Sequence, residues 1–271
     1  MRLVNIKPRR GMQFLIGALP IVAILILYAV LAAARADANP HDKILPTFAA
    51  MGQAALRLAT EVDPRTGEIT ALADTTASLW RLGIGVAIAT ASTLLLGLAL
   101  GVVPLIRSAL GPLVTIIAVI PPIAVLPVLF IAFGLGEASK IALIAIGIAP
   151  FMIRDLTAYV AGLPVEQMIK AQTLGANSWQ LTLRVALPQA LPRLIDSLRL
   201  SMGPAWVFLI SAEAIASDVG LGYRIFLVRR YLSMDIILPY VAWISILAIA
   251  TDAILQLISR KAFPWAHGDA K

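Results

Sequence analysis

The chain has 271 residues, of which 60% are hydrophobic and only 14% are charged. A soluble domain carries about 25% charged and about 45–50% apolar residues, so this composition excludes an ordinary soluble protein and indicates one that crosses a membrane several times. The formal net charge of +7 does not indicate a nucleic-acid partner, because the basic residues lie at the ends of apolar runs and form no single patch.

The first apolar run extends over residues 14–34 and follows four basic residues of the N-terminal arm: Arg2, Lys7, Arg9 and Arg10. A cleavable signal peptide has an apolar core of about 7–15 residues, whereas a membrane span needs about 20. The length of the run therefore favours an uncleaved transmembrane helix, so that residues 1–35 form the arm and the first span. Cleavage after the sequence AAARA is the alternative.

Residues 36–78 form an external loop in which acidic side chains outnumber basic ones. Within it, the sequence LPTFAAMGQAALRLATEV offers Thr47 as an N-cap and places Phe48, Met51 and Leu58 at helical spacing. This pattern predicts an amphipathic helix lying at the membrane surface. The sequence DPRTGE at 63–68 predicts a turn.

Five further apolar runs predict the remaining spans, at about 79–104, 113–133, 139–160, 194–214 and 236–259. Pro121, Pro122 and Pro127 interrupt the second of these runs, and proline removes a backbone donor and kinks a helix. Lysine and arginine gather in the arm, the 161–193 loop and the tail at 261–271. The positive-inside rule therefore places both termini and this loop in the cytoplasm. Residues 79–260 form the main transmembrane domain.

The 161–193 loop contains the sequence IKAQTLGANSWQLTLRVALPQALPR, which is polar for so apolar a chain. Its periodicity predicts a short helix before Gly175 and a second helix after it, with Asn177 or Ser178 as N-cap. Pro188 and Pro192 are expected to close the second helix. Two short helices joined at a glycine would form a compact knob outside the bilayer. An ordinary amphipathic connector is the alternative.

This loop resembles the cytoplasmic EAA loop of type I ABC importer permeases, in which E-A-A is followed after a short interval by glycine and later by I-x-L-P. Ala171, Gly175 and the sequence Val185-Ala186-Leu187-Pro188 match that pattern. Lys170 and Gln172 stand in place of the glutamate and the second alanine, and Glu166 lies one turn earlier. The departure leaves the identity of the partner contact open.

Other blocks extend the resemblance over roughly residues 45–265: LPTF, SLWRLGIGVAIAT, IPPIAVLPVLFIAFGLGEASKI, LRLSMGPAWVFLISAEAI and GLGYRI. They are similar to the nitrate/sulfonate/taurine-type branch of these permeases. The resemblance implies an all-α membrane protein with six transmembrane helices and a cytoplasmic coupling loop. It also implies a permease homodimer, two cytoplasmic ATPase subunits and an external or periplasmic binding protein that delivers a small solute.

The resemblance assigns contact with the ATPase to residues of the 161–193 loop: Glu166, Lys170, Ala171, Leu174, Gly175, Ala176, Trp179 and Pro188. The chain has no G-x-x-x-x-G-K-[ST] sequence to hold ATP phosphates and no recognisable catalytic arrangement. We therefore expect a chain that is not itself an enzyme and binds no cofactor, with ATP and Mg²⁺ held by the partner subunit. Cysteine is absent and His41 and His267 are isolated, so no metal site is expected.

Charges inside apolar spans are costly, so they need partners or water. Arg199 and Asp252 lie at similar depths in the fifth and sixth spans, and we expect them to pair, the alternative being that each reaches separately toward the interface. Glu213, with Gly220 and Gly222, lies at the external end of the fifth span. These three are candidates for contact with the binding protein, or Glu213 braces the 215–224 loop.

Candidates for the solute path are the residues of the kinked span and of the fifth span that could line a gate: Pro121, Pro122, Met202, Trp206 and Ser211. Tryptophan in a span more often serves packing, which is the alternative for Trp206. Gly97 and Gly101 form G-x-x-x-G, which allows close approach of backbones within one subunit or between two.

Two other classes of protein are open to a chain of this composition. A secondary transporter driven by an ion gradient predicts acidic residues near the bilayer midplane and inverted repeats, but Asp252 lies near the cytoplasmic end and no repeat is recognisable. A membrane-embedded enzyme predicts a cluster of titratable residues, which the sequence does not contain.

Overall fold

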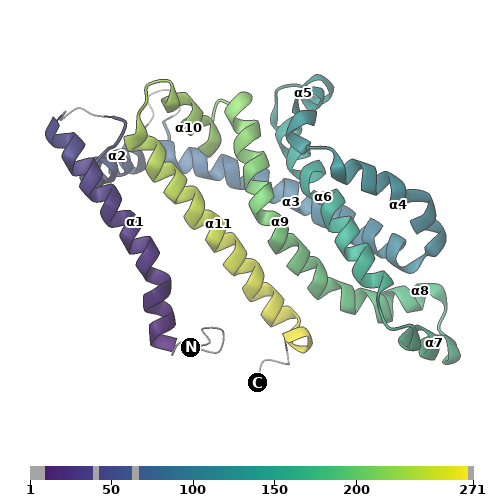
Figure 1. Ribbon diagram of the computed structural model, residues 1–271. Coiled ribbons are helices and arrows are strands. Elements are labelled where there is room, and N and C mark those ends of the chain that lie inside the picture. The colour runs from purple at the N-terminus through teal and green to yellow at the C-terminus, as the bar shows by residue number, and fades with distance from the viewer. Residues whose placement is uncertain (1–9, 39–42, 63–66, 268–271) are drawn as a thin grey trace.

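The computed structural model describes residues 10–38, 43–62 and 67–267 (Figure 1). Most of the N-terminal arm, His41 and part of the expected 63–68 turn lie outside these ranges. The described part is helical, and its one strand-like pairing is a bridge between Val62 and Ile69. In chain order the elements are α1 (Arg10–Ala38), α2 (Phe48–Thr60), α3 (Thr70–Val102), α4 (Pro104–Val119), α5 (Pro122–Phe133), α6 (Glu137–Ala161), α7 (Val165–Thr173), α8 (Ser178–Leu181), the π-helical turn η2 (Thr182–Ala186), α9 (Leu187–Ile215), α10 (Leu221–Arg229), α11 (Met234–Ala262) and the 3₁₀ turn η3 (Pro264–His267).

Five helices of the described chain are long and apolar enough to cross a membrane: α1, α3, α6, the continuous helix from Ser178 to Ile215, and α11. Helices α4 and α5 are together long and apolar enough for a sixth crossing, and they meet at a bend of 100°. Six spans are thus confirmed if the bent pair counts as one. The third span is not the kinked rod expected at 113–133, because Pro121 and Pro122 supply no N–H donors and the helix ends at Val119.

The second span begins earlier than the sequence indicates, at Thr70 instead of residue 79. Its first turns contain Asp74, Thr75 and Ser78, whose polarity is typical of a loop. All three are buried against other helices, so their hydrogen bonds are made within the protein and the helix extends beyond the apolar run. The external loop is correspondingly shorter.

The expectation that Pro188 and Pro192 close a helix was wrong, because the helix that begins at Ser178 runs through both prolines. The π-helical turn Thr182–Ala186 lies just before Pro188, and the N–H of Leu187 bonds the carbonyl of Thr182, five residues back. Pro188 occupies the first turn of α9, where a missing N–H is tolerated. The coupling loop and the fifth span therefore form one continuous helix.

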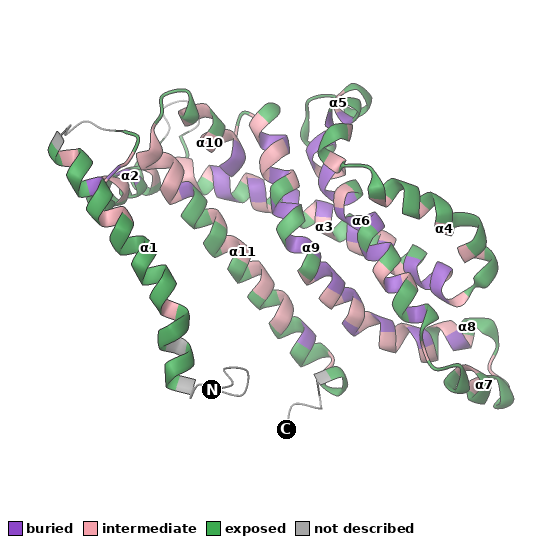
Figure 2. Cartoon of the chain, in the orientation of Figure 1, coloured by how far each residue is buried: buried purple, intermediate pink, exposed green. Residues whose placement is uncertain are grey.

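The hydrophobic core lies where α3, α6 and α9 pack together, whereas α1 and α11 are largely exposed (Figure 2). Gly97 and Gly101 face α6, since a methyl group on either would contact Leu156 or Val160. The G-x-x-x-G sequence therefore serves packing within the subunit.

The first span stands apart from the bundle and touches it near α2 (Figure 1). The Tyr28 hydroxyl donates to the Pro46 carbonyl at 2.7 Å, and its ring lies 5.3 Å from that of Phe48. A helix is present at the predicted position as α2, and Thr47 caps it by accepting from the N–H of Ala50.

We predict that Gly101→Ala destabilises the protein by about 1–3 kcal/mol, because overpacking forces neighbours to shift. The new methyl group would lie 2.5 Å from Cβ of Val160. Gly83→Ala is the matched control, since Gly83 lies on the same helix with nothing within 4 Å of its missing methyl. Thermal unfolding in detergent measures both variants, and equal stability would contradict the close α3–α6 packing.

Candidate functional site

The first candidate site is the α7–α8 loop, residues 162–181, which projects at the lower right of Figure 1. Helix α7 ends before Gly175, whose φ of +85° is a backbone conformation that favours glycine. Asn177 then caps α8: its side chain accepts from the Gln180 N–H at 2.8 Å, and the Gln180 side chain accepts from the Asn177 N–H at 3.0 Å. The predicted pair of helices joined at a glycine is therefore present.

Apolar side chains cover the outer surface of this loop. Leu174 is 80% exposed and Trp179 is 69% exposed, and Val165 and Ile169 are exposed beside them. The other coupling candidates also lie here, with Glu166 and Lys170 exposed and Ala171 and Ala176 half-buried, except Pro188, which lies in the first turn of α9. An exposed apolar surface on a polar loop outside the apolar spans indicates a protein-binding surface.

The second candidate site lies at the opposite end of the molecule, where Glu213 is fully buried near the end of α9. Its carboxylate accepts from the Ser78 hydroxyl at 2.8 Å, from the Arg81 guanidinium at 2.6 Å and from the Gly222 N–H at 2.9 Å. Arg81 also donates to Glu137 at 2.5 and 2.8 Å. These bonds join α3, α6, α9 and α10 at one point.

Asp74 is the second fully buried carboxylate at this end. It accepts from the Gly220 N–H at 2.9 Å, from Arg224 at 2.8 Å and from the Tyr240 hydroxyl at 2.9 Å. Helix α11 is thereby joined to α3 and α10. We call this network the α10 clasp and define it by its side chains: Asp74, Ser78, Arg81, Glu137, Lys140, Glu213, Arg224 and Tyr240.

The charges of the α10 clasp balance. Three carboxylates, on Asp74, Glu137 and Glu213, face three cations, on Arg81, Lys140 and Arg224. A buried charge is tolerated only when it is paired and hydrogen-bonded, and here each one is. The network therefore fixes how the helices meet at this end.

A direct contact of Glu213, Gly220 and Gly222 with a binding protein does not fit this geometry, because all three residues are buried. A methyl group on Gly220 would lie 2.6 Å from the Glu213 carboxyl group, and one on Gly222 would lie 2.6 Å from the Ile210 carbonyl oxygen. The alternative role for Glu213, bracing the 215–224 loop, is what the hydrogen bonds support.

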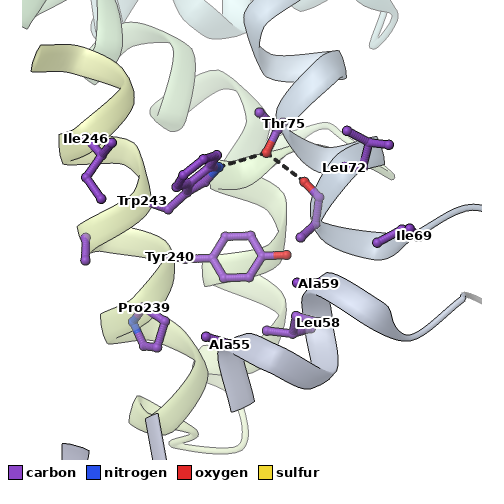
Figure 3. Close-up of a pocket in the computed structure, with 12 residues that line it drawn as sticks. Ala55, Leu58, Ala59, Ile69, Leu72, Thr75, Pro239, Tyr240, Trp243 and Ile246 are labelled. Atoms are coloured by element: carbon purple, nitrogen blue, oxygen red, sulfur yellow. Dashed lines mark hydrogen bonds between the residues drawn. The ribbon is translucent and has the colours of Figure 1, made fainter. Parts of the chain in front are cut away.

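A cavity of about 590 Å³ lies beside the clasp between α2, α3 and α11 (Figure 3). The Trp243 indole N–H donates to Thr75 at 3.0 Å, and the Tyr240 hydroxyl is used by Asp74. The remaining lining is apolar, from side chains such as Leu58, Leu72 and Ile246. With its polar groups already paired, this cavity offers no group to orient a small polar solute.

The structure does not assemble the expected solute path within one subunit. Met202 and Trp206 lie one turn apart on the face of α9 that packs into the core, so both are buried. Pro121 is exposed at the bend between α4 and α5, and Ser211 donates to the carbonyl of Val207. Packing, the alternative considered for Trp206, fits its position better than a gate does.

Arg199 and Asp252 form an ion pair between α9 and α11. The Arg199 Nε atom lies 2.8 Å from Asp252 Oδ1, and its Nη2 atom lies 3.0 Å from Oδ2. This bidentate geometry is the strong form of an arginine–carboxylate ion pair. The predicted contact is therefore present, and it joins two spans at a distance from the clasp.

Most of the clasp was missed by the sequence analysis. Asp74, Ser78 and Arg81 are spaced four and three residues apart, which places them on one face of a helix. That spacing was the available signal, but residues 36–78 were assigned to a loop. Nothing local in the sequence indicates that Glu137, Arg224 and Tyr240 converge on the same point.

Comparison with known proteins gives consistent results. The family described as "Binding-protein-dependent transport system inner membrane component" matches residues 83–264. The taurine transport system permease protein TauC of Escherichia coli is 34% identical over 195 residues, which are 72% of this chain and 70% of TauC. The nitrate import permease protein NrtB of Leptolyngbya laminosa is 26% identical over 69% of this chain and 67% of NrtB.

Among solved structures, an inward-facing conformation of the MetNI methionine ABC transporter has a similar fold. The TM-score is 0.62 at 20% sequence identity, covering 71% of this chain and 95% of the other chain. At this identity the similarity concerns the fold alone.

We predict that Glu213→Gln lowers the free energy of unfolding by about 1.5–3 kcal/mol, because it weakens the charge-assisted hydrogen bond from Arg81 while Arg81 keeps Glu137 as a carboxylate partner. The side chain keeps nearly the same shape, so a packing defect is not the cause. Glu166→Gln on the exposed surface of α7 is the control and should leave stability unchanged. Thermal unfolding measures the stability of both variants. If Glu213→Gln is as stable as the unmodified protein, the clasp does not have the structural role assigned to it.

Proposed function

Because the chain belongs to the family of binding-protein-dependent transport system inner membrane components and is a permease subunit of an ABC importer, we propose the following assembly and mechanism of import. Two copies form the membrane pore, an external binding protein delivers the solute, and ATP with Mg²⁺ is held by separate cytoplasmic ATPase subunits. Alternating access then requires that the two states of the pore differ in their contacts with both partners.

The observation that carries this proposal is the exposed apolar surface of the α7–α8 loop, with Leu174 and Trp179 at its centre. A partner that contacts α8 acts directly on a membrane span, because Ser178–Ile215 is one helix. At about 1.5 Å per residue, this helix is roughly 57 Å long and reaches from the loop to the α10 clasp. Movement of the ATPase at one end can therefore shift helices at the other.

The distribution of basic residues supports a cytoplasmic position for the α7 end. Among the residues at that end are Arg154, Arg184, Arg193 and Arg260. Arginines also lie at the opposite end, but two of them, Arg81 and Arg224, are paired with buried carboxylates of the clasp. The positive-inside rule favours such residues on the cytoplasmic side. In this orientation both termini are cytoplasmic, and α2 and the α10 clasp lie on the external side.

The names of two relatives support a proposal for the solute class. TauC is a taurine permease and NrtB is a nitrate permease by their names. Taurine carries a sulfonate group and nitrate is an oxyanion, so we propose that the solute is a small molecule with an oxyanion group. The cognate binding protein would supply the rest of the selectivity.

Uptake by proteoliposomes tests this function. The permease is reconstituted with its ATPase subunits and binding protein, and accumulation of labelled taurine, methanesulfonate and nitrate is measured with ATP inside. We expect uptake of at least one of them that requires ATP and the ATPase subunit. Uptake that persists without the ATPase subunit and follows an ion gradient would instead identify a secondary transporter.

We further predict that Leu174→Ala weakens association with the ATPase subunit and lowers transport about tenfold, as expected when an apolar side chain at the centre of an interface is truncated. Leu105→Ala is a matched control, because Leu105 is also a leucine with 80% of its surface exposed. Copurification of the ATPase subunit and the uptake assay are the measurements. Equal effects of the two variants would place the ATPase contact elsewhere.

A further inference from the structure

A second cavity, of about 730 Å³, lies near the α7 end of the molecule between the end of α3, the first turns of α4 and the last turns of α6. It is distinct from the apolar cavity of Figure 3, because its lining includes charged and hydroxyl side chains. Its ionisable lining residues are Arg107, Arg154 and Asp155. The chemistry of this cavity is therefore decided by two cations and one carboxylate.

The carboxylate is already paired outside the cavity. Arg193 on α9 donates to both oxygens of Asp155, with its Nε atom 3.0 Å from Oδ2. Arg193 also lies over the Tyr159 ring, 5.9 Å from its centre. Asp155 is thus neutralised by a cation that does not line the cavity. The two arginines that do line it keep their positive charge without a carboxylate partner among the described residues.

Arg107 is held in place by the end of α3. Its Nε atom donates to the Leu100 carbonyl at 2.8 Å, and its Nη2 atom donates to the Gly101 carbonyl. A guanidinium group has five N–H donors, so three remain after these two bonds. The carbonyls fix the orientation of the group and leave a planar set of donors available.

Thr157 belongs to the same wall, and its hydroxyl is unpaired. Its Oγ1 atom is buried and has no hydrogen-bond partner among the described residues. A threonine hydroxyl can both donate and accept, so Thr157 is a lining residue with an unused polar group. By contrast, the hydroxyls of Ser108 and Thr115 already donate to backbone carbonyls of α4.

We propose that this cavity binds an oxyanion group through Arg107, Arg154 and Thr157. Arginine is suited to this task, because its planar donors match the oxygens of a sulfonate, nitrate or phosphate group. The proposal rests on the proposed function where the anion is the transported solute, for which the cavity is a binding site on the cytoplasmic half of the route. An anionic lipid headgroup presents the same chemistry.

Arg107 also connects this cavity to the coupling loop. It lines a third cavity, of about 370 Å³, whose other walls include Val165, Met168 and Gln172 of α7 and Ser178 of α8. A movement of the α7–α8 loop therefore changes the surroundings of a side chain that binds the anion. Release of the anion can in this way depend on the state of the ATPase.

Binding measurements on the permease with its ATPase subunits test the proposal. The complex is placed in nanodiscs of neutral phosphatidylcholine, and equilibrium binding of radiolabelled methanesulfonate is measured. We expect saturable binding that Arg154→Gln weakens about tenfold or more, the usual effect of removing a charge-assisted hydrogen bond. Arg260→Gln is the matched control, because it removes the same charge from an exposed position at the same end, outside the cavity.

Thr157→Val is the second variant and separates binding from folding. Valine has the same shape and lacks the unpaired hydroxyl, so thermal stability should be kept or raised while methanesulfonate binding weakens. Binding unchanged in both Arg154→Gln and Thr157→Val, or weakened equally by Arg260→Gln, would overturn the assignment.

A lipid arm distinguishes the two sources of the anion. The same complexes are prepared with phosphatidylglycerol, and retained lipid is identified by native mass spectrometry. Retention that Arg154→Gln abolishes, without methanesulfonate binding, supports the oxyanion site and assigns it to a lipid headgroup. If neither ligand binds while ATP-driven uptake is intact, the site is refuted and the proposed function stands. If methanesulfonate binds but ATP-driven uptake is absent, the proposed function fails and the site stands.

Discussion

The architecture depends on the requirement that charges buried at the α10 end be paired within the protein. Asp74 and Glu213 are fully buried, and Arg81 and Lys140 are nearly so. Water cannot reach these groups, so each needs a partner within the protein. Lys140 pairs with Glu137 on its own helix, whereas the other three pair with residues of other helices. Because the partners come from α3, α6, α9, α10 and α11, satisfying the charges fixes the relative positions of five helices. The apolar contacts between the same helices are less directional and could not specify this arrangement by themselves.

The helix Ser178–Ile215 connects the α10 clasp to the exposed α7–α8 loop at the opposite end of the molecule. The π-helical turn at Thr182–Ala186 and the first-turn position of Pro188 let the chain pass from α8 into α9 without a break. Glu213 then joins the far end of α9 to the clasp, and the ion pair of Arg199 with Asp252 joins its middle to α11. A displacement imposed at the loop would act on one continuous helix, which contacts groups that hold the other spans together.

Local patterns in the sequence predicted much of this structure. The features that were missed depend on contacts between residues that lie far apart in the sequence. Apolar runs gave the spans, Thr47 and Asn177 gave the helix caps, and Gly175 gave the turn of the loop, because each of these features depends on neighbouring residues. The start of α3 was misplaced because a polar helical turn buried by distant residues resembles a loop. Pro188 and Pro192 were wrongly expected to end a helix. A π-helical turn precedes Pro188, and Pro192 lies inside α9.

Pairing also separates the charges that hold the structure from those available for binding. Within the clasp every carboxylate and every cation has a partner of opposite sign, so the network has no charge left to attract a ligand. In the cavity near the α7 end, Asp155 forms an ion pair with Arg193. Arg107 donates to neutral backbone carbonyls, which do not cancel its charge. A folded chain tolerates such an uncompensated charge where solvent or a ligand can reach it. The same residue types therefore have different roles at the two ends of the permease. At the α10 end, ion pairs hold helices together, and near the α7 end, arginines without a carboxylate partner in the described chain are available to bind an anion.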